Sequence, residues 1–222
     1  MFFKLIKLLK IKLKIVVLLI PVLLFSDQLM AKETRLLILG DSLSAGYGIS
    51  QTEGWVSLLQ DMWQGKSITI INGAISGETT DGALARLPRL LEQNKPTHVY
   101  IELGGNDGLQ GHPVSKMMEN LDSIISQSID SGAAVFLQAM AIPTNYGKRY
   151  TDMFSAAYES LASKHRVPLI PFFLQNIALN KKLMQADGIH PNAEAQAIIA
   201  KDMEKILGDL ILSSRTDNKQ LH

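Results

Sequence analysis

The chain has 222 residues, of which 46% are hydrophobic and 19% are charged, and it contains no cysteine. This composition excludes a disordered chain, disulfide bonds, thiolate metal sites and a cysteine nucleophile, and the length suits one domain with a substantial core. Residues 1–31 hold five of the 22 basic and one of the 21 acidic residues, so residues 32–222 carry a net charge of −3, which excludes a general attraction for nucleic acid.

The first segment of the chain is typical of an export signal. Lysines alternate with apolar residues over positions 1–14, and an uncharged apolar run of 11 residues follows at 15–25. As a helix, such a run spans only about half of a ~30 Å hydrocarbon core. A basic stretch, a short apolar segment and a small residue together indicate a secretory signal peptide. We therefore expect residues 1–31 to be cleaved after Ala31 and the protein to be periplasmic or secreted. An uncleaved N-terminal membrane anchor is the alternative.

The rest of the chain alternates short apolar segments with amphipathic ones. The predicted strands are Arg35–Leu39, Ile68–Ile71, His98–Leu103, Ala134–Gln138 and Leu169–Phe172. The predicted helices are Gly54–Trp63, Thr79–Leu91, Val114–Ser131, Tyr150–His165 and Asn192–Leu212. Strands that are apolar almost throughout are typical of a parallel sheet covered on both faces. The pattern predicts one three-layer α/β domain over residues 32–212, followed by a polar tail at 213–222.

Ligands of such sheets bind outside the carboxyl ends of the strands, which directs attention to the loops. Four segments there combine small residues with chemically useful ones: Gly40–Gly46, Asn72–Thr79, Gly104–Gly108 and Asp187–Pro191. None contains G-x-G-x-x-G or a glycine-rich turn ending in G-K-[ST], so nucleotide binding has little support. Asp41, Asp187 and His190 are the residues that suit a metal, but no H-E-x-x-H or comparable ligand pair appears. We expect no metal site.

A nucleophile fits these loops better. A serine needs a base to take its proton, and the base needs a third group to orient it. Ser42 follows a strand, His190 is the best base available, and Asp187 stands three residues before it. Donors for a developing oxyanion are the Ser42 and Gly77 backbone N–H groups and the Asn106 side-chain amide.

The same residues resemble a known family. The blocks Gly40–Ser44 (GDSLS), Gly77 within ISGET, Gly104–Asp107 (GGND) and Asp187–Pro191 (DGIHP) are similar, in order, to the four signature blocks of the GDSL or SGNH hydrolases. The resemblance implies a flavodoxin-like fold with a five-stranded parallel sheet and helices on both faces. It also implies Ser42 as nucleophile, His190 as base and Asp187 as its partner, with Ser42, Gly77 and Asn106 as the oxyanion hole.

The resemblance further implies an esterase or thioesterase that acts on lysophospholipid, aryl-ester or acyl-CoA substrates through an acyl-enzyme, without a cofactor. For an exported enzyme, lipid esters are better natural substrates than the scarce acyl-CoA. The apolar loop residues either pack the loops or line an acyl groove. The groove candidates are Ile75, Leu109, Ile142, Pro143 and Tyr146.

Three alternatives stay open: a carbohydrate acetylesterase on the same fold, a non-catalytic lipid-binding envelope protein, and a flavodoxin-like cofactor binder. We expect a monomer whose partner is a small acyl ester or lipid, with no nucleic acid and no obligate protein partner.

Overall fold

The structure is a computed structural model that describes residues 33–220. Its five strands are all parallel and lie in the order β2-β1-β3-β4-β5. The strands are β1 (Thr34–Gly40), β2 (Ile68–Asn72), β3 (His98–Glu102), β4 (Ala134–Gln138) and β5 (Leu169–Ile170). The predicted α/β fold with a five-stranded parallel sheet is confirmed.

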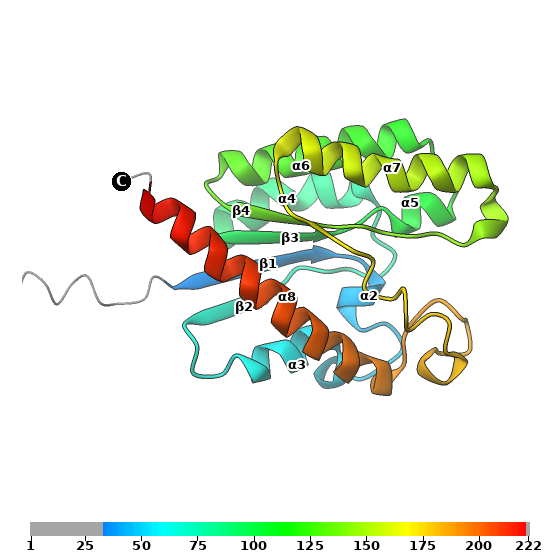
Figure 1. Cartoon of the computed structure of the whole chain (residues 1–222), viewed down its shortest axis with the longest axis horizontal. Coiled ribbons are helices and arrows are strands. Elements are labelled where there is room, and N and C mark those ends of the chain that lie inside the picture. The colour runs from blue at the N-terminus through cyan, green and yellow to red at the C-terminus, as the bar shows by residue number, and fades with distance from the viewer. Residues whose placement is uncertain (1–32, 221–222) are drawn as a thin grey trace, which may run out of the picture. The chain divides into compact units, whose positions relative to one another are not determined.

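Helices cover both faces of this sheet, and Figure 1 shows α3 and α8 on one face and α4, α6 and α7 on the other. The helices are α2 (Ser42–Ala45), α3 (Trp55–Met62), α4 (Thr80–Asn94), α5 (Gly105–Leu109), α6 (Val114–Asp130), α7 (Lys148–His165) and α8 (Ala193–Gln220). Short 3-10 turns are η2 (Gln51–Glu53), η3 (Thr144–Tyr146) and η4 (Lys181–Leu183). The three layers follow from strands that are apolar on both faces.

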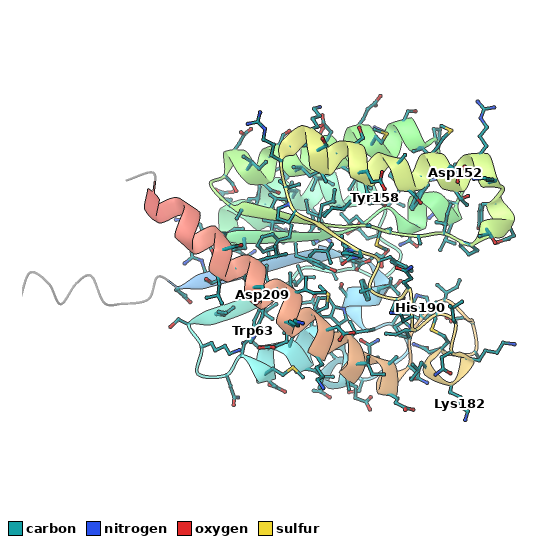
Figure 2. All side chains as sticks on the ribbon, viewed as in Figure 1. Trp63, Asp152, Tyr158, Lys182, His190 and Asp209 are labelled. Atoms are coloured by element: carbon teal, nitrogen blue, oxygen red, sulfur yellow. The ribbon has the colours of Figure 1, made fainter. Side chains whose placement is uncertain are left out.

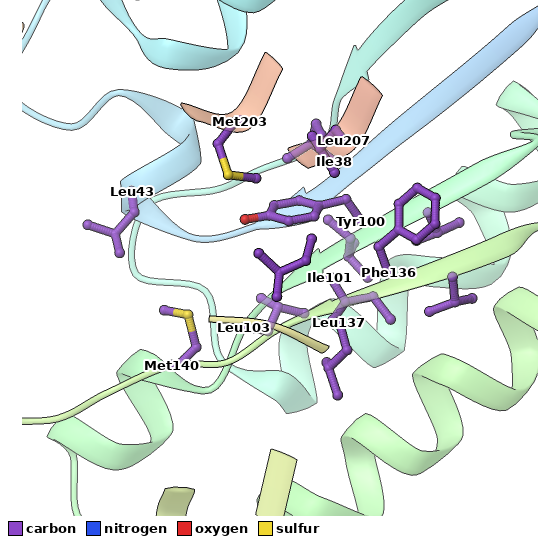
Figure 3. Packing of buried hydrophobic residues seen from close by; sticks show 14 of the residues in the cluster. Ile38, Leu43, Tyr100, Ile101, Leu103, Phe136, Leu137, Met140, Met203 and Leu207 are labelled. Atoms are coloured by element: carbon purple, nitrogen blue, oxygen red, sulfur yellow. The ribbon is translucent and has the colours of Figure 1, made fainter. Parts of the chain in front are cut away.

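The core is built from residues that alternate across the sheet. Ile101 and Tyr100 are neighbours on β3, both fully buried, and their side chains point to opposite faces. Figure 3 shows Met203 and Leu207 of α8 beside Tyr100, with Ile101 on the other side of the strand. Continuous burial of this kind explains why the middle of β3 is apolar, whereas its two ends carry His98 and Glu102.

Four predicted ends differ from the observed ones by two residues or more: the end of α4 at Asn94, the start of α7 at Lys148, the end of β5 and the end of α8. The last strand stops at Ile170 instead of Phe172, because Pro171 has no N–H to donate to a ladder. The last helix does not end at Leu212, since α8 continues to Gln220 into the segment predicted as a polar tail. No glycine or proline stops it there, and Ser214 Oγ lies 2.8 Å from His98 Nε2 at the start of β3, which holds this part of α8 against the sheet.

The predicted signal peptide lies outside the described residues. Within residues 33–220, no helix is both long and apolar enough to cross a membrane.

The strand order places a crevice beside β1. The chain moves outward from β1 to β2 and then crosses to β3 on the opposite side, so the connections after β1 and β3 diverge. In open α/β sheets this switch point is the usual binding site. The connections after β1 and β3 carry Ser42 and Asn106, in the short helices α2 and α5.

Candidate active site

Ser42 is held by a tight turn at the end of β1. It is the first residue of the one-turn helix α2, and Asp41 caps this helix by accepting a hydrogen bond from the Leu43 N–H at 3.0 Å. Gly46 ends the helix in the left-handed conformation, with φ of 75°. The serine side chain is thereby fixed at the edge of the sheet where the loops converge.

Asp187 and His190 form a second tight turn, in the loop before α8. The ring Nδ1 of His190 lies 2.7 Å from Asp187 Oδ2, while Asp187 Oδ1 accepts the backbone N–H groups of Ile189 (2.9 Å) and His190 (3.0 Å). Partial burial acts to raise the pKa of Asp187. The hydrogen bonds from His190 and Ile189 outweigh it and lower that pKa from 3.8 to about 2. Asp187 is therefore ionised at neutral pH.

The two turns meet at a hydrogen bond between Ser42 Oγ and His190 Nε2, 2.8 Å long. Figure 2 shows His190 at the end of the molecule where the loops gather. An ionised Asp187 can only accept, so the proton on the neutral ring belongs on Nδ1. The lone pair of Nε2 is then free to accept the hydroxyl hydrogen of Ser42.

Two further side chains support the His190 turn. The ring of Tyr47 lies against the imidazole, with centroids 4.4 Å apart. The side-chain amide of Gln185 donates to the backbone oxygens of Tyr47 (2.7 Å) and Pro191 (3.1 Å). Gln185 also donates its backbone N–H to the oxygen of His190 at 2.8 Å. The loops carrying Ser42 and His190 are thus tied together by side chains that no sequence motif singled out.

Gly77 and Asn106 lie in the same cavity as Ser42 and His190. Gly77 has φ of 79°, a left-handed conformation that favours glycine. The Asn106 amide nitrogen donates to the backbone oxygen of Glu78 at 2.9 Å and to Asp41 Oδ2 at 3.2 Å. These contacts fix the amide so that its NH₂ group, and not its oxygen, faces Asp41 and the backbone oxygen of Glu78.

The cavity beside Ser42 has a volume of about 600 Å³ and a mostly apolar lining. Three of the predicted groove residues, Leu109, Ile142 and Pro143, line it. Ile75 and Tyr146 are not among its lining residues. Ile75 is 49% exposed, and Tyr146 donates its hydroxyl to the backbone oxygen of Leu109 at 2.7 Å.

Other lining residues were missed by the sequence reasoning. They come from α2 and the turn after it, the segments after β4 and β5, and the loop before α8: Leu43, Tyr47, Met140, Ala141, Phe172, Leu174, Ala178, Met184 and Ile189. Phe172 and Leu174 follow a strand end within an apolar run, a signal that was open to the same rule as the other loops. Tyr47 and Met184 carry no comparable signal.

Asp41, Asp187 and His190, whose residue types suit a metal, form hydrogen bonds within the protein instead. Among residues 33–220, no group of three or more His, Cys, Asp or Glu side chains is placed to hold a metal ion. Asp187 bonds to His190, whereas Asp41 bonds to Leu43 and Asn106.

Comparisons with known proteins agree with this site. Residues 38–198 match the GDSL-like Lipase/Acylhydrolase family. The chain is 50% identical over 169 residues to an arylesterase of Vibrio mimicus (75% of this chain, 84% of that one), and 46% identical over 181 residues to thioesterase 1/protease 1/lysophospholipase L1 of Escherichia coli K12 (82% and 86%).

A solved structure is similar as well. The psychrotrophic esterase EstA from Pseudoalteromonas sp., in a crystal structure inhibited by monoethylphosphonate, superposes with a TM-score of 0.79 at 46% identity, over 81% of this chain and 99% of that one. Family and relatives agree with the resemblance drawn from the four sequence blocks. The chain belongs to the GDSL-like lipase/acylhydrolase family and is a hydrolase with esterase function.

Proposed function

We propose that Ser42, His190 and Asp187 are the catalytic triad of this esterase and that it hydrolyses acyl esters and thioesters through an acyl-enzyme. The observation that carries the proposal is the unbroken series of hydrogen bonds Asp187–His190–Ser42, which ends at the apolar cavity. Such a series is what a serine nucleophile requires for activation.

The proton transfers follow from these contacts. His190 Nε2 takes the Ser42 hydroxyl proton as Oγ attacks the carbonyl carbon, and ionised Asp187 stabilises the imidazolium that forms. His190 then returns the proton to the leaving alcohol or thiol, which leaves the acyl group on Ser42. A water molecule, deprotonated by the same ring, then attacks the acyl carbon. The bond from this carbon to Ser42 Oγ breaks, Oγ takes the proton back from His190, and the acid is released.

In this mechanism the oxyanion of the tetrahedral intermediate accepts hydrogen bonds from the Ser42 and Gly77 N–H groups and from Asn106. Both hydrogens of the Asn106 amide already have acceptors in the protein. The hydrogen bond to Asp41, at 3.2 Å, is the longer of the two. We expect the N–H group of this bond to donate to the oxyanion as well.

Replacing Asn106 with alanine or aspartate is expected to lower kcat by about 10²–10³-fold, because one oxyanion donor is lost. The aspartate variant keeps the shape of the side chain but has no N–H. Steady-state kinetics with p-nitrophenyl butyrate measure the effect. Turnover within threefold of wild type in both variants would remove Asn106 from the oxyanion hole.

The apolar cavity supports acyl chains longer than acetyl. Its volume of about 600 Å³ far exceeds that of an acetyl group, and we propose fatty acyl esters as substrates, with lysophospholipid and aryl esters preferred over acyl-CoA. Relatives named arylesterase and thioesterase 1/protease 1/lysophospholipase L1 support these classes.

The variant Leu109→Trp is expected to lower kcat/KM for a 12-carbon ester about tenfold relative to a 4-carbon ester, because room for about two methylenes is lost at ~0.8 kcal/mol each. Ile75→Trp is the matched control, since Ile75 is exposed and outside the lining. Rates for a series of p-nitrophenyl esters measure the chain-length profile. Equal profiles for the two variants would contradict an acyl site at Leu109.

Covalent trapping tests the function directly. The full-length protein is incubated with an alkyl phosphonate ester, whose tetrahedral phosphorus resembles the intermediate, and the labelled residue is mapped by mass spectrometry. The relative EstA is inhibited by monoethylphosphonate. Labelling of Ser42 together with turnover of long-chain esters supports the proposal. Activity confined to acetyl esters would favour an acetylesterase, and lipid binding without labelling or turnover would favour a binding protein.

We further propose that the enzyme acts after export, in the periplasm or outside the cell, as a monomer on small acyl esters or lipids. The basic and apolar pattern of residues 1–25 supports export. Cell fractionation combined with N-terminal sequencing of the extracted enzyme tests this. A new N-terminus at Lys32 in the periplasm would support cleavage, while an intact N-terminus in the membrane fraction would support the anchor.

A further inference from the structure

Two carboxyl groups lie buried beneath the loop that carries Ser42, and the mechanism above uses neither as an acid or a base. Asp41 directly precedes the nucleophile and is 3% exposed, whereas Glu102, the last residue of β3, is fully buried. Glu102 pairs with Gly40 in the register of β1 and β3. Two negative charges buried side by side would repel each other strongly. One of the two carboxyl groups is therefore expected to hold a proton, and the question is which one.

The four carboxyl oxygens of Asp41 and Glu102 differ in the hydrogen bonds that they accept. Glu102 Oε2 accepts the hydroxyl of Ser44 at 2.7 Å and the backbone N–H of Asp41 at 3.3 Å. Asp41 Oδ1 accepts the Leu43 N–H, and Oδ2 accepts the Asn106 amide. Glu102 Oε1 is buried and has no donor among the described residues.

The two residues are buried next to each other, since the Asp41 backbone N–H donates to Glu102 Oε2, and a hydrogen bond between two carboxyl groups requires one of them to be protonated. Both Asp41 oxygens already accept N–H groups, whereas Glu102 Oε1 accepts nothing. A proton on this oxygen would turn the unpaired buried acceptor into a donor.

The directions in which the two pKa values shift agree with a proton on Glu102. Burial first, and then the charge of Asp41, raise the pKa of Glu102 well above its usual 4.5. Burial raises the pKa of Asp41 as well, but the Leu43 N–H, the bond from Glu102 and the charge of His190 oppose the rise. The other ionisable groups that face the pair are Tyr100, Asp107 and Tyr158.

The glycines of two signature blocks make room for the pair. A Cβ atom on Gly40 would lie 2.7 Å from Glu102 Oε2, and one on Gly105 would lie 3.2 Å from Asp41 Oδ2. Only glycine at position 40 allows the Glu102 carboxyl to approach the turn that holds Ser42. The carboxyl pair is therefore built into the same loops as the proposed nucleophile and oxyanion hole.

We propose that Glu102 is a positioning residue that keeps its proton and donates it to Asp41, so that Asp41 remains an acceptor for the Leu43 N–H and the Asn106 amide. Asp41 then orients both sides of the site, the turn of Ser42 and the amide nitrogen of Asn106. A proton on Asp41 instead would let the Asn106 amide turn its oxygen toward the site. This inference rests on the proposed roles of Ser42 and Asn106.

Glu102→Gln and Glu102→Ala test the proposal. The glutamine amide donates to Asp41 as the protonated acid does, and its oxygen accepts from Ser44, so kcat for p-nitrophenyl butyrate is expected within threefold of wild type. The alanine variant removes the donor and the acceptor, and kcat is expected to fall tenfold or more with KM changed less than threefold. Equal losses in the two variants, or an alanine variant with wild-type kcat, would overturn the proposal.

A readout without activity decides the matter if Glu102→Ala does not fold. A carboxyl whose pKa is raised in the folded state contributes stability that is full below its unfolded pKa of 4.5 and is lost as the pH rises toward the folded pKa. The Tm of Glu102→Gln minus that of wild type should therefore increase from about pH 5 to about pH 8. A constant difference would mean that Glu102 is ionised. The infrared band of a protonated carboxylic acid should also disappear in Glu102→Gln.

These readouts separate the two proposals. Failure of phosphonate to label Ser42 would refute the proposed catalytic role of Ser42, while the dependence of Tm on pH would still report the protonation of Glu102. Conversely, labelled Ser42 with a pH-independent Tm difference would refute only the role of Glu102.

Discussion

Ser42→Ala is expected to lower kcat for p-nitrophenyl esters by about 10⁴-fold or more, because no other group replaces the nucleophile. The fold should be retained. Within residues 33–220 the Ser42 side chain hydrogen-bonds to His190, and alanine is favourable at the start of a helix. Thermal unfolding followed by circular dichroism checks this directly.

The matched control is Ser76→Ala. Ser76 lines the same cavity, and its loss should leave kcat within threefold of wild type. A Ser42→Ala enzyme that retains more than about 1% of wild-type turnover would contradict a serine nucleophile at position 42.

Asp187→Asn is expected to lower kcat about 10³–10⁴-fold through the wrong tautomer of His190. The single oxygen of asparagine can accept either the two backbone N–H groups that Asp187 Oδ1 now binds or the ring Nδ1–H, but not both sets. If it keeps the backbone bonds, its NH₂ faces Nδ1, the ring proton moves to Nε2, and His190 can no longer accept the proton of Ser42.

The pH profile adds a second check on Asp187. Its pKa of about 2 means that it stays ionised above about pH 3, so any loss of wild-type activity above that pH is not expected to come from protonation of Asp187. Folding lowers the pKa of Asp187, so this residue stabilises the folded state at neutral pH. Its contribution to the free energy of unfolding is full above about pH 3.8 and is lost as the pH falls toward 2. Asp152→Asn, an exposed position, is the control, and near wild-type kcat in Asp187→Asn would contradict the proposed role of Asp187.

The positions of the strands and helices could largely be predicted, because burial imposes a local period on the sequence. Strand β4 was predicted with its observed ends, and α6 to within one residue. The errors at the ends of α8 and β5 came from features that a burial period does not include, the first a tertiary contact and the second a proline inside the predicted strand. The extent of α8 depends on the contact between Ser214 and His98, and the end of β5 depends on the missing N–H of Pro171.

The candidate site divides in the same way. Ser42, Asp187 and His190 were recognisable because each lies in a short block whose residue types suit one chemistry. Ile75 and Tyr146 were placed in the groove from their loops alone, yet neither lines the cavity, since the direction of a loop side chain depends on what packs against it. Tyr47 reaches His190 across the fold and could not be predicted from its own segment.

Local sequence thus determined the α/β pattern, the family and the residues able to do the chemistry, because propensity, burial period and motif spacing act over a few residues. Only the tertiary structure decided that Ser42 and His190, 148 positions apart, come within hydrogen-bond distance. It also decided which apolar side chains enclose the cavity and that Glu102 and Asp41 are buried next to each other. These properties depend on parallel strands that bring distant loops to one edge of the sheet and on the burial this produces.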